Sequence, residues 1–281
     1  MSTSPTITTW AAGDYPAMAR RLAPAAERAV AAAAPGPGTT VLDVGCGTGN
    51  AALAAARCGS AVTAADPTPE LLAIAAQRAR TEGLSIAFHH ADADHTTGAY
   101  DRVLSVFGAM YVPDHPRTAQ ILIHRCAPGG RIVSAAWTPD GLMAATNRAT
   151  SPYLPPPPAG GRPPVGWGDE GYLRALFTGH EVTVTTEHVP FTFESPLAAA
   201  EFWVRTAGHL QAERERLLAD GNAWQDLHHD LADVFTEWNR AEGAGIRVES
   251  AYLLAQIHPA PAGADREPKA GGVNAGCGAN G

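Results

Sequence analysis

The stretch VLDVGCGTGN, residues 41–50, decides the fold of this 281-residue chain. Its first residues form a short, mostly apolar run, which is typical of a buried β-strand. Gly45, Gly47 and Gly49 follow, and the alanine-rich residues after them predict a helix over Asn50–Cys58. A glycine loop between a strand and a helix lets a ligand approach the backbone closely and meet the free N–H groups of the helix N-terminus.

The spacing of this loop separates two kinds of cofactor. The pattern is G-x-G-x-G, whereas a dinucleotide-binding loop keeps its third glycine one residue later. Asp43 brings a negative charge to the mouth of the loop, which would repel a pyrophosphate but not a cationic ligand. The loop therefore favours a cationic ligand, and a nicotinamide-dependent oxidoreductase stays as an alternative.

Strands and helices alternate on both sides of the loop. A helix over Tyr15–Ala34, interrupted at Pro24, precedes it, and Pro-Gly-Gly at 128–130 predicts a turn before the fifth strand. We predict strands at 41–44, 61–65, 84–90, 101–107, 131–137, 181–193 and 246–258, and helices at 50–58, 69–82, 114–126, 169–177 and 196–240. This alternation indicates parallel βαβ units with right-handed crossovers. The predicted fold is α/β, Rossmann-like and doubly wound, with a mostly parallel seven-stranded sheet and a helical insert between the last two strands.

Composition excludes several classes of function. The net charge is −8, and no basic cluster offers the footprint with which nucleic-acid enzymes neutralise phosphates, so we expect no nucleic-acid partner. No apolar run approaches the ~18 residues that span a bilayer, and no signal peptide is recognisable, which predicts a cytoplasmic protein without a membrane partner. The only lysine, Lys269, lies in a Gly/Ala-rich tail, which excludes a Schiff-base or P-loop lysine. Irregularly spaced cysteines predict no metal site.

The motifs together resemble the class I S-adenosylmethionine-dependent methyltransferases. Residues 43–49 match the first motif of that family, D-x-G-x-G-x-G. Asp66 ends the second strand, where the family places an acid on the ribose hydroxyls, and Asp92 follows the third, where the family holds the adenine amino group. Residues 105–108 match the end of the fourth strand and 127–130 the turn before the fifth. The resemblance covers about residues 10–140 and is closest to the branch that acts on quinones, fatty acids and natural products.

The resemblance implies S-adenosylmethionine as the cofactor and S-adenosylhomocysteine as its product. It also implies that an N-terminal aromatic segment closes over the cofactor and that Ala93 offers backbone contacts to the adenine ring. The cofactor contacts implied in this way are Trp10, Tyr15, Asp43, Gly45, Cys46, Gly47, Gly49, Asn50, Asp66, Pro67, Asp92, Ala93 and Ser105.

Simpler structural roles stay open for several of these residues. Asp66 and Asp92 are also suited to ending a strand or forming a turn, and Trp10 and Tyr15 to an apolar staple before the first helix. The Asn/Asp-Pro-Pro-aromatic tetrad of exocyclic-amine and DNA methyltransferases is absent after the fourth strand, which argues further against a nucleobase acceptor.

Methyl transfer needs an aligned acceptor and a dry pocket more than a strong acid–base pair. We expect a small-molecule acceptor, natural-product-like or quinone- or phenol-like, under the aromatic-rich helical insert. Tyr111, Trp137 and Trp203 are candidate walls of its pocket, and His209 and His115 are candidate general bases, although helix packing and capping are the simpler roles. Methylation at oxygen, nitrogen or carbon stays open, as does a non-catalytic cofactor-binding partner.

The chain divides into six predicted segments. We expect a monomer or homodimer built from an N-terminal helical segment (1–38), a cofactor-binding α/β core (39–140), a Pro-rich loop with a helix and the sixth strand (141–195), a helical substrate lid (196–243), the last strand (244–258) and a disordered tail (259–281).

Overall fold

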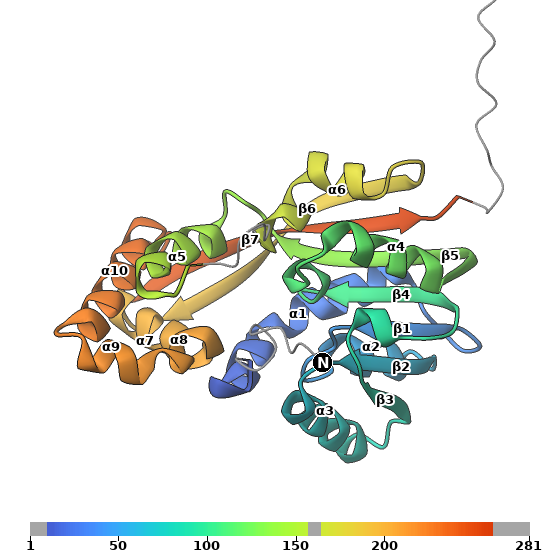
Figure 1. Ribbon diagram of the computed structural model, residues 1–281, viewed down its shortest axis with the longest axis horizontal. Helices are drawn as coiled ribbons and strands as arrows, with labels where there is room; N and C mark the ends of the chain where they lie inside the picture. Colours follow the sequence, from blue (N-terminus) through green and yellow to red (C-terminus); the bar gives the residue numbers. More distant parts are fainter. Residues whose placement is uncertain (1–9, 157–163, 261–281) are drawn as a thin grey trace, which may run out of the picture.

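The computed structural model describes residues 10–156 and 164–260, and its centre is one seven-stranded sheet (Figure 1). The strand order is β3-β2-β1-β4-β5-β7-β6. Strands β1 to β5 pair in parallel, and β7 pairs antiparallel with both β5 and β6. The strands are β1 (Thr40–Val44), β2 (Ala61–Asp66), β3 (Ile86–His90), β4 (Tyr100–Val106), β5 (Cys126–Trp137), β6 (Glu181–Phe193) and β7 (Ile246–His258). This arrangement confirms the predicted α/β, Rossmann-like fold.

Helices surround the sheet and gather at one end of its longest strands. Helices α1 and α2 pack against each other, α3 lies along β2 and β3, and α4 packs on β5. Helices α5 and α7–α10 form a group at one end of β6 and β7, on the left in Figure 1. The helices are α1 (Tyr15–Ala33), α2 (Asn50–Arg57), α3 (Pro69–Thr81), α4 (His115–Arg125), α5 (Leu142–Thr150), α6 (Glu170–Leu176), α7 (Pro196–Thr206), α8 (Gly208–Ala212), α9 (Arg214–Ala219) and α10 (Ala223–Glu237), with short 3-10 turns η1 (Trp10–Ala12), η2 (Ala93–His95), η3 (Ala109–Tyr111), η4 (Ser151–Tyr153) and η5 (Pro164–Gly168).

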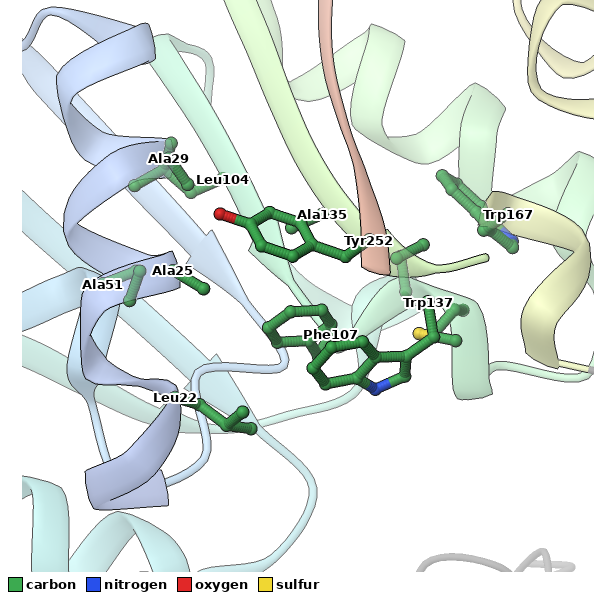
Figure 2. Packing of buried hydrophobic residues seen from close by; sticks show 14 of the residues in the cluster. Leu22, Ala25, Ala29, Ala51, Leu104, Phe107, Ala135, Trp137, Trp167 and Tyr252 are labelled. Carbon is green, nitrogen blue, oxygen red and sulfur yellow. The ribbon is translucent and has the colours of Figure 1, made fainter. Parts of the chain in front are cut away.

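The interruption predicted at Pro24 is wrong, because helix α1 runs unbroken through this proline. A proline inside a helix removes one backbone hydrogen bond and costs about 3 kcal/mol. The helix tolerates this cost because one of its faces, including Leu22, Ala25 and Ala29, is buried in the core (Figure 2). Asp14 caps its N-terminus by accepting a hydrogen bond from the Ala17 N–H at 3.2 Å.

Three further segments differ from the expected pattern. The helix predicted over 196–240 is divided into four helices, α7 to α10. Strand β5 begins at Cys126, and the predicted Pro-Gly-Gly turn is an irregularity within it: Cys126 pairs with Tyr100, and Arg131 is the next residue paired, with Arg102. Helix α5 was not predicted. The tail predicted to be disordered lies, from residue 261 on, outside the described residues, as do residues 157–163 of the Pro-rich loop.

Candidate active site

The glycine loop after β1 bends by means of residues with positive φ. Gly45 has φ +71° and Gly47 has φ +53°, values that residues other than glycine rarely adopt. A Cβ on Gly45 would lie 2.9 Å from the Cα of Gly108, so the loop and the end of β4 approach more closely than a side chain permits. The N–H groups of Gly45 and Cys46 both donate to the Ala65 carbonyl, at 2.9 and 3.1 Å. The loop is thereby fixed to the end of β2.

Asp66, at the end of β2, holds the same loop from the other side. One carboxylate oxygen accepts the Gly47 N–H at 2.8 Å and the other accepts the Thr68 N–H at 2.8 Å. Burial raises the pKa of this carboxyl, and the two N–H donors act in the opposite direction. The Thr68 side chain also forms a hydrogen bond with this carboxylate, and its two oxygens together still have room for a ligand hydroxyl. Asp66 therefore shapes the loop in addition to the predicted contact with a ribose.

Asp43 is a buried carboxylate with one unsatisfied oxygen. Its side chain is only 1% exposed, and its Oδ2 has no hydrogen-bond partner. Burial raises the pKa of Asp43 to about 7, the backbone N–H of Ala52 lowers it, and the charge of Asp66 raises it further. An unpaired buried acid is costly, and a cationic ligand group would compensate it. The residues present therefore fit a cofactor with a positively charged end.

A small cavity lies directly beside Asp43 and is closed by α1. Its volume is about 30 Å³, roughly the space of one water molecule. Tyr15 of α1 forms one wall, and a Cβ on Gly47 would lie 3.4 Å from its ring. A cofactor can fill this part of the site only when Tyr15 or the segment before it moves.

Aromatic side chains extend from this cavity toward the helical insert. The Trp10 ring lies edge-on to Tyr15 and to Tyr111, with centroids 5.4 and 4.9 Å apart. The Trp137 side chain donates a hydrogen bond to the Tyr111 hydroxyl, while burial raises the pKa of Tyr111 to about 12. Trp137 also stacks on Phe107, with centroids 3.9 Å apart (Figure 2). We call Trp10, Tyr15 and Tyr111 the aromatic cluster.

Phe107 is a functional candidate that the sequence did not single out. It follows β4, lines the cavity, and has φ +54°, which is strained for a residue with a large side chain. Such strain persists only where packing enforces it, here the stack on Trp137 and an edge contact with Tyr252 at 5.5 Å.

Arg78 is a second residue that sequence reasoning missed. Its guanidinium donates to the Thr48 carbonyl at 2.6 Å and to Asn50 Oδ1 at 2.8 Å. The Asn50 amide in turn donates to the Ala19 carbonyl of α1 at 2.6 Å. Asn50, predicted to contact the cofactor, lines the cavity but joins α1, the loop and α3 with both ends of its amide.

Ser105 and Asp92 also make internal hydrogen bonds. The Ser105 hydroxyl donates to the Val44 carbonyl and accepts the Ala109 N–H, both at 2.8 Å, so it fastens β4 to β1. Asp92 caps η2 by accepting the His95 N–H at 3.1 Å and contacting His95 Nδ1 at 2.6 Å.

The residues predicted to hold the adenine ring, Asp92 and Ala93, lie at the same edge of the sheet as the glycine loop. Asp66 pairs with His90 across β2 and β3, which brings Asp92 and Ala93, just past β3, to the edge where the loop lies. The Pro67 carbonyl contacts His90 Nε2 at 3.0 Å. Cys46, in the loop, is buried, and burial raises the pKa of its thiol.

His115, the second candidate general base, is buried and contacts the protein with both ring nitrogens. It is 1% exposed, with Nε2 3.1 Å from the Met110 carbonyl and Nδ1 3.2 Å from the Tyr172 hydroxyl. Because the carbonyl only accepts, Nε2 carries the proton and the Nδ1 lone pair faces the hydroxyl. The side chain therefore fixes the start of α4 instead of facing the cavity.

The two candidates on the insert differ from each other. Trp203 is 6% exposed and packs edge-on against Phe191 of β6 and Phe235 of α10, at 5.5 and 5.2 Å, so its ring is enclosed between the insert and the sheet. His209 is exposed on α8, a helix that contacts η1 and hence the segment with Trp10. Neighbouring protein partly desolvates the ring, whose surface stays exposed to solvent, and this lowers the pKa of His209.

Within residues 10–156 and 164–260, no helix is long and apolar enough to cross a membrane, and no group of three or more His, Cys, Asp or Glu side chains is placed to hold a metal.

Comparisons with known proteins show the family to which the chain belongs. A family model described as a methyltransferase domain matches residues 41–130, which contain the loop, Asp66 and Asp92. An uncharacterized protein of Mycobacterium tuberculosis is 40% identical over 189 residues, 66% of this chain and 69% of its own length. A demethylmenaquinone methyltransferase of Thermus thermophilus is 36% identical over 104 residues, 35% of this chain and 47% of its own.

A solved structure shows the same fold. A putative methyltransferase of Bacillus halodurans superimposes with a TM-score of 0.59 at 15% identity, over 84% of this chain and 99% of its own. The α/β fold, the glycine loop and the matched methyltransferase domain together define a class I enzyme that uses S-adenosylmethionine. The chain belongs to the S-adenosylmethionine-dependent methyltransferase family and is a methyltransferase.

Proposed function

We propose that this enzyme methylates a small aromatic acceptor of the phenol or quinol type, held between the glycine loop and α8. The observation that carries the proposal is the aromatic cluster, which lies beside the loop and is contacted by α8. Flat apolar walls suit a flat apolar acceptor. The name of the demethylmenaquinone methyltransferase relative supports this class of acceptor.

On the cofactor side, we assign the binding groups to the loop and two acids. Asp43 would pair with a cationic end of S-adenosylmethionine, the loop N–H groups would face its main body, and Asp66 would accept from the ribose hydroxyls. When bound, the cofactor supplies an activated methyl group, whose bond to sulfur breaks and leaves its electron pair on sulfur as the bond to the acceptor forms. The protein's part is to align the acceptor and exclude water.

His209 is the proposed general base. A base must be unprotonated at working pH, and the lowered pKa of His209 keeps its imidazole neutral near pH 7. The acceptor hydroxyl would give its proton to a ring nitrogen of His209, so the oxygen uses the freed electron pair for the new bond to carbon. Its place on α8, which contacts the η1 turn that carries Trp10, supports this role.

The insert is the proposed lid of this pocket. Asp14 and Arg205 join it to the N-terminal segment by an ion pair of 2.6 Å and by the Asp14 N–H to the Arg205 carbonyl at 3.0 Å. The same segment continues into Tyr15, which covers the loop. A cytoplasmic location and a role in secondary metabolism remain predictions attached to this proposal.

The test is methyl transfer from labelled S-adenosylmethionine to a panel of phenols, quinols, N-heterocycles and fatty acids. We expect turnover with phenols or quinols. In His209→Gln, kcat should fall at least tenfold, and the acidic limb of the pH profile, which we expect below the ordinary histidine pKa of about 6.5, should disappear. S-adenosylhomocysteine should bind this variant as it binds the wild type. Transfer only to N-heterocycles or fatty acids, or an unchanged pH profile, would contradict the proposal.

A further inference from the structure

A second hollow lies on the other side of α1 from the cofactor cavity. Its volume is about 430 Å³, and it lies between α1 and α7. The cofactor cavity uses positions 15, 19, 22 and 26 of α1, whereas this hollow uses 17, 20 and 21. At about 3.6 residues per turn, these two sets point to different sides of the helix. The lining residues of the second hollow are Ala17, Arg20, Arg21, Phe202 and Arg205.

Two of the three arginines are held in position around one aromatic ring. The Arg21 guanidinium lies 5.0 Å from the centre of the Phe202 ring and 4.8 Å from that of Phe193, and it donates to the Thr192 carbonyl at 3.2 Å. The Arg205 guanidinium lies 5.5 Å from the Phe202 ring. A guanidinium has five N–H donors, so both side chains retain donors beyond these contacts.

The hollow has an excess of positive charge in an acidic protein. Arg20 is exposed and has no hydrogen bond or ion pair with any residue in the described ranges. Asp14 pairs with Arg205 at 2.6 Å, and among the described residues no ion pair joins Glu201, one turn earlier on α7, to these arginines. Three guanidiniums thus face one paired carboxylate, although the whole chain carries −8. Even with the charge of Glu201 included, the hollow keeps a net positive charge, which favours an anion.

We propose that this hollow binds the phosphate group of a small organic phosphate, with the organic part resting on Phe202. Guanidinium groups match phosphate oxygens in geometry and stay charged at any physiological pH. The hollow is far larger than a bare ion needs, and its Phe202 wall is apolar. Because Arg21 belongs to α1 and Arg205 to α7, a bound phosphate would bridge the helix that covers the cofactor cavity and the first helix of the insert.

Calorimetry on the full chain tests this proposal with phenyl phosphate and inorganic phosphate as probes. We expect phenyl phosphate to bind more tightly than inorganic phosphate, and both to bind more weakly as salt rises. Arg20→Gln and Arg21→Gln should each weaken phenyl phosphate binding at least tenfold. Arg148→Gln is the matched control: this exposed arginine of α5 also lacks a partner in the described ranges, and its loss changes the net charge equally.

Binding of S-adenosylhomocysteine should stay the same in all three variants, which separates the hollow from the cofactor site. If the phosphate belongs to the methyl acceptor, phenyl phosphate should compete with that acceptor in turnover assays; if it belongs to a separate ligand, the KM of the acceptor should not change. Three results would overturn the proposal: no binding of phenyl phosphate, an equal loss in Arg148→Gln, or displacement of phenyl phosphate by S-adenosylhomocysteine. Arg20→Gln keeps the test valid even if Arg21→Gln disturbs folding, because Arg20 makes no hydrogen bond or ion pair within residues 10–156 and 164–260.

Discussion

Replacing Asp43 by asparagine should stabilise the free protein and weaken cofactor binding. Burial raises the pKa of Asp43 from 3.8 to about 7. Because the pKa of Asp43 is higher in the folded than in the unfolded protein, ionisation of its carboxyl destabilises the folded state. This loss of stability is absent below pH 4, grows as the pH rises, and is complete above pH 7. At about 1.36 kcal/mol per pH unit, it reaches roughly 2 kcal/mol at pH 5.5 and roughly 4 kcal/mol at pH 8.

Asparagine removes this penalty but introduces a buried amide N–H at the position of the unpartnered Oδ2, at a cost of about 1–3 kcal/mol. The free energy of unfolding in urea should therefore rise by roughly 1–3 kcal/mol at pH 8 and change little at pH 5.5. Binding should move in the opposite direction. Loss of a hydrogen bond between charged groups costs about 1.5–3 kcal/mol, or roughly a 10- to 150-fold increase in the Kd of S-adenosylhomocysteine.

The pH dependence of binding gives a second readout. In the wild type, the affinity for S-adenosylhomocysteine should fall below pH 7, because the Asp43 carboxyl must lose its proton to pair with the ligand amino group. This dependence should be absent in Asp43→Asn. The control ligand is 5′-methylthioadenosine, which lacks the amino acid part and should bind both proteins alike. An asparagine variant that binds S-adenosylhomocysteine with wild-type affinity and pH dependence would refute the reasoning.

Three further substitutions probe the loop and the insert. Gly47→Ala should cost about 1–2 kcal/mol, because its φ is +53°, and should weaken S-adenosylhomocysteine binding while the circular dichroism spectrum stays native; unchanged binding would mean that the loop tolerates a Cβ. Asp66→Ala leaves two backbone N–H groups without their acceptor, at a cost of about 1–3 kcal/mol each, so both the melting temperature and the cofactor affinity should fall. A variant that loses only one of the two would show that Asp66 either supports the loop or contacts the cofactor, but does not do both. Trp203→Ala should lower the free energy of unfolding by about 3–5 kcal/mol and change the cofactor affinity by less than tenfold. An altered choice of acceptors without loss of stability would instead show that Trp203 lines the acceptor pocket.

The parts of the fold that could be predicted are those encoded in short stretches of sequence. Strands β6 and β7 have the predicted bounds, because alternating side chains and flanking turns define them locally. The helix break predicted at Pro24 is wrong because a proline signals only the local loss of a backbone hydrogen bond. The burial of one face of α1, which outweighs this loss, depends on contacts with residues distant in the sequence. Helix α5 lies beside the Pro-rich loop and packs on α10, a contact that its short sequence does not signal.

The same limit applies to the site. Residue type indicates which side chains carry donors and acceptors, but not whether the fold already uses them. Ser105, Asn50 and His115 were all reasonable candidates, and each proves to bond with the protein itself. Arg78 holds the loop from α3, far along the chain, and nothing in its sequence neighbourhood marks it for that role.

The N-terminal segment connects the two halves of the proposed site. Gly13 packs so closely on the turn between α7 and α8 that a Cβ there would lie 2.9 Å from the Gly208 nitrogen, and two residues later Tyr15 covers Gly47. The cofactor cavity beneath Tyr15 holds only about one water molecule, so filling it displaces Tyr15 or its neighbours. Because those neighbours also contact the insert, the position of the insert and the occupancy of the cofactor site cannot be independent. A ligand shifts such an equilibrium only by its difference in affinity for the two arrangements, and these differ at the contact between Tyr15 and Gly47, which a cofactor on the loop would have to replace.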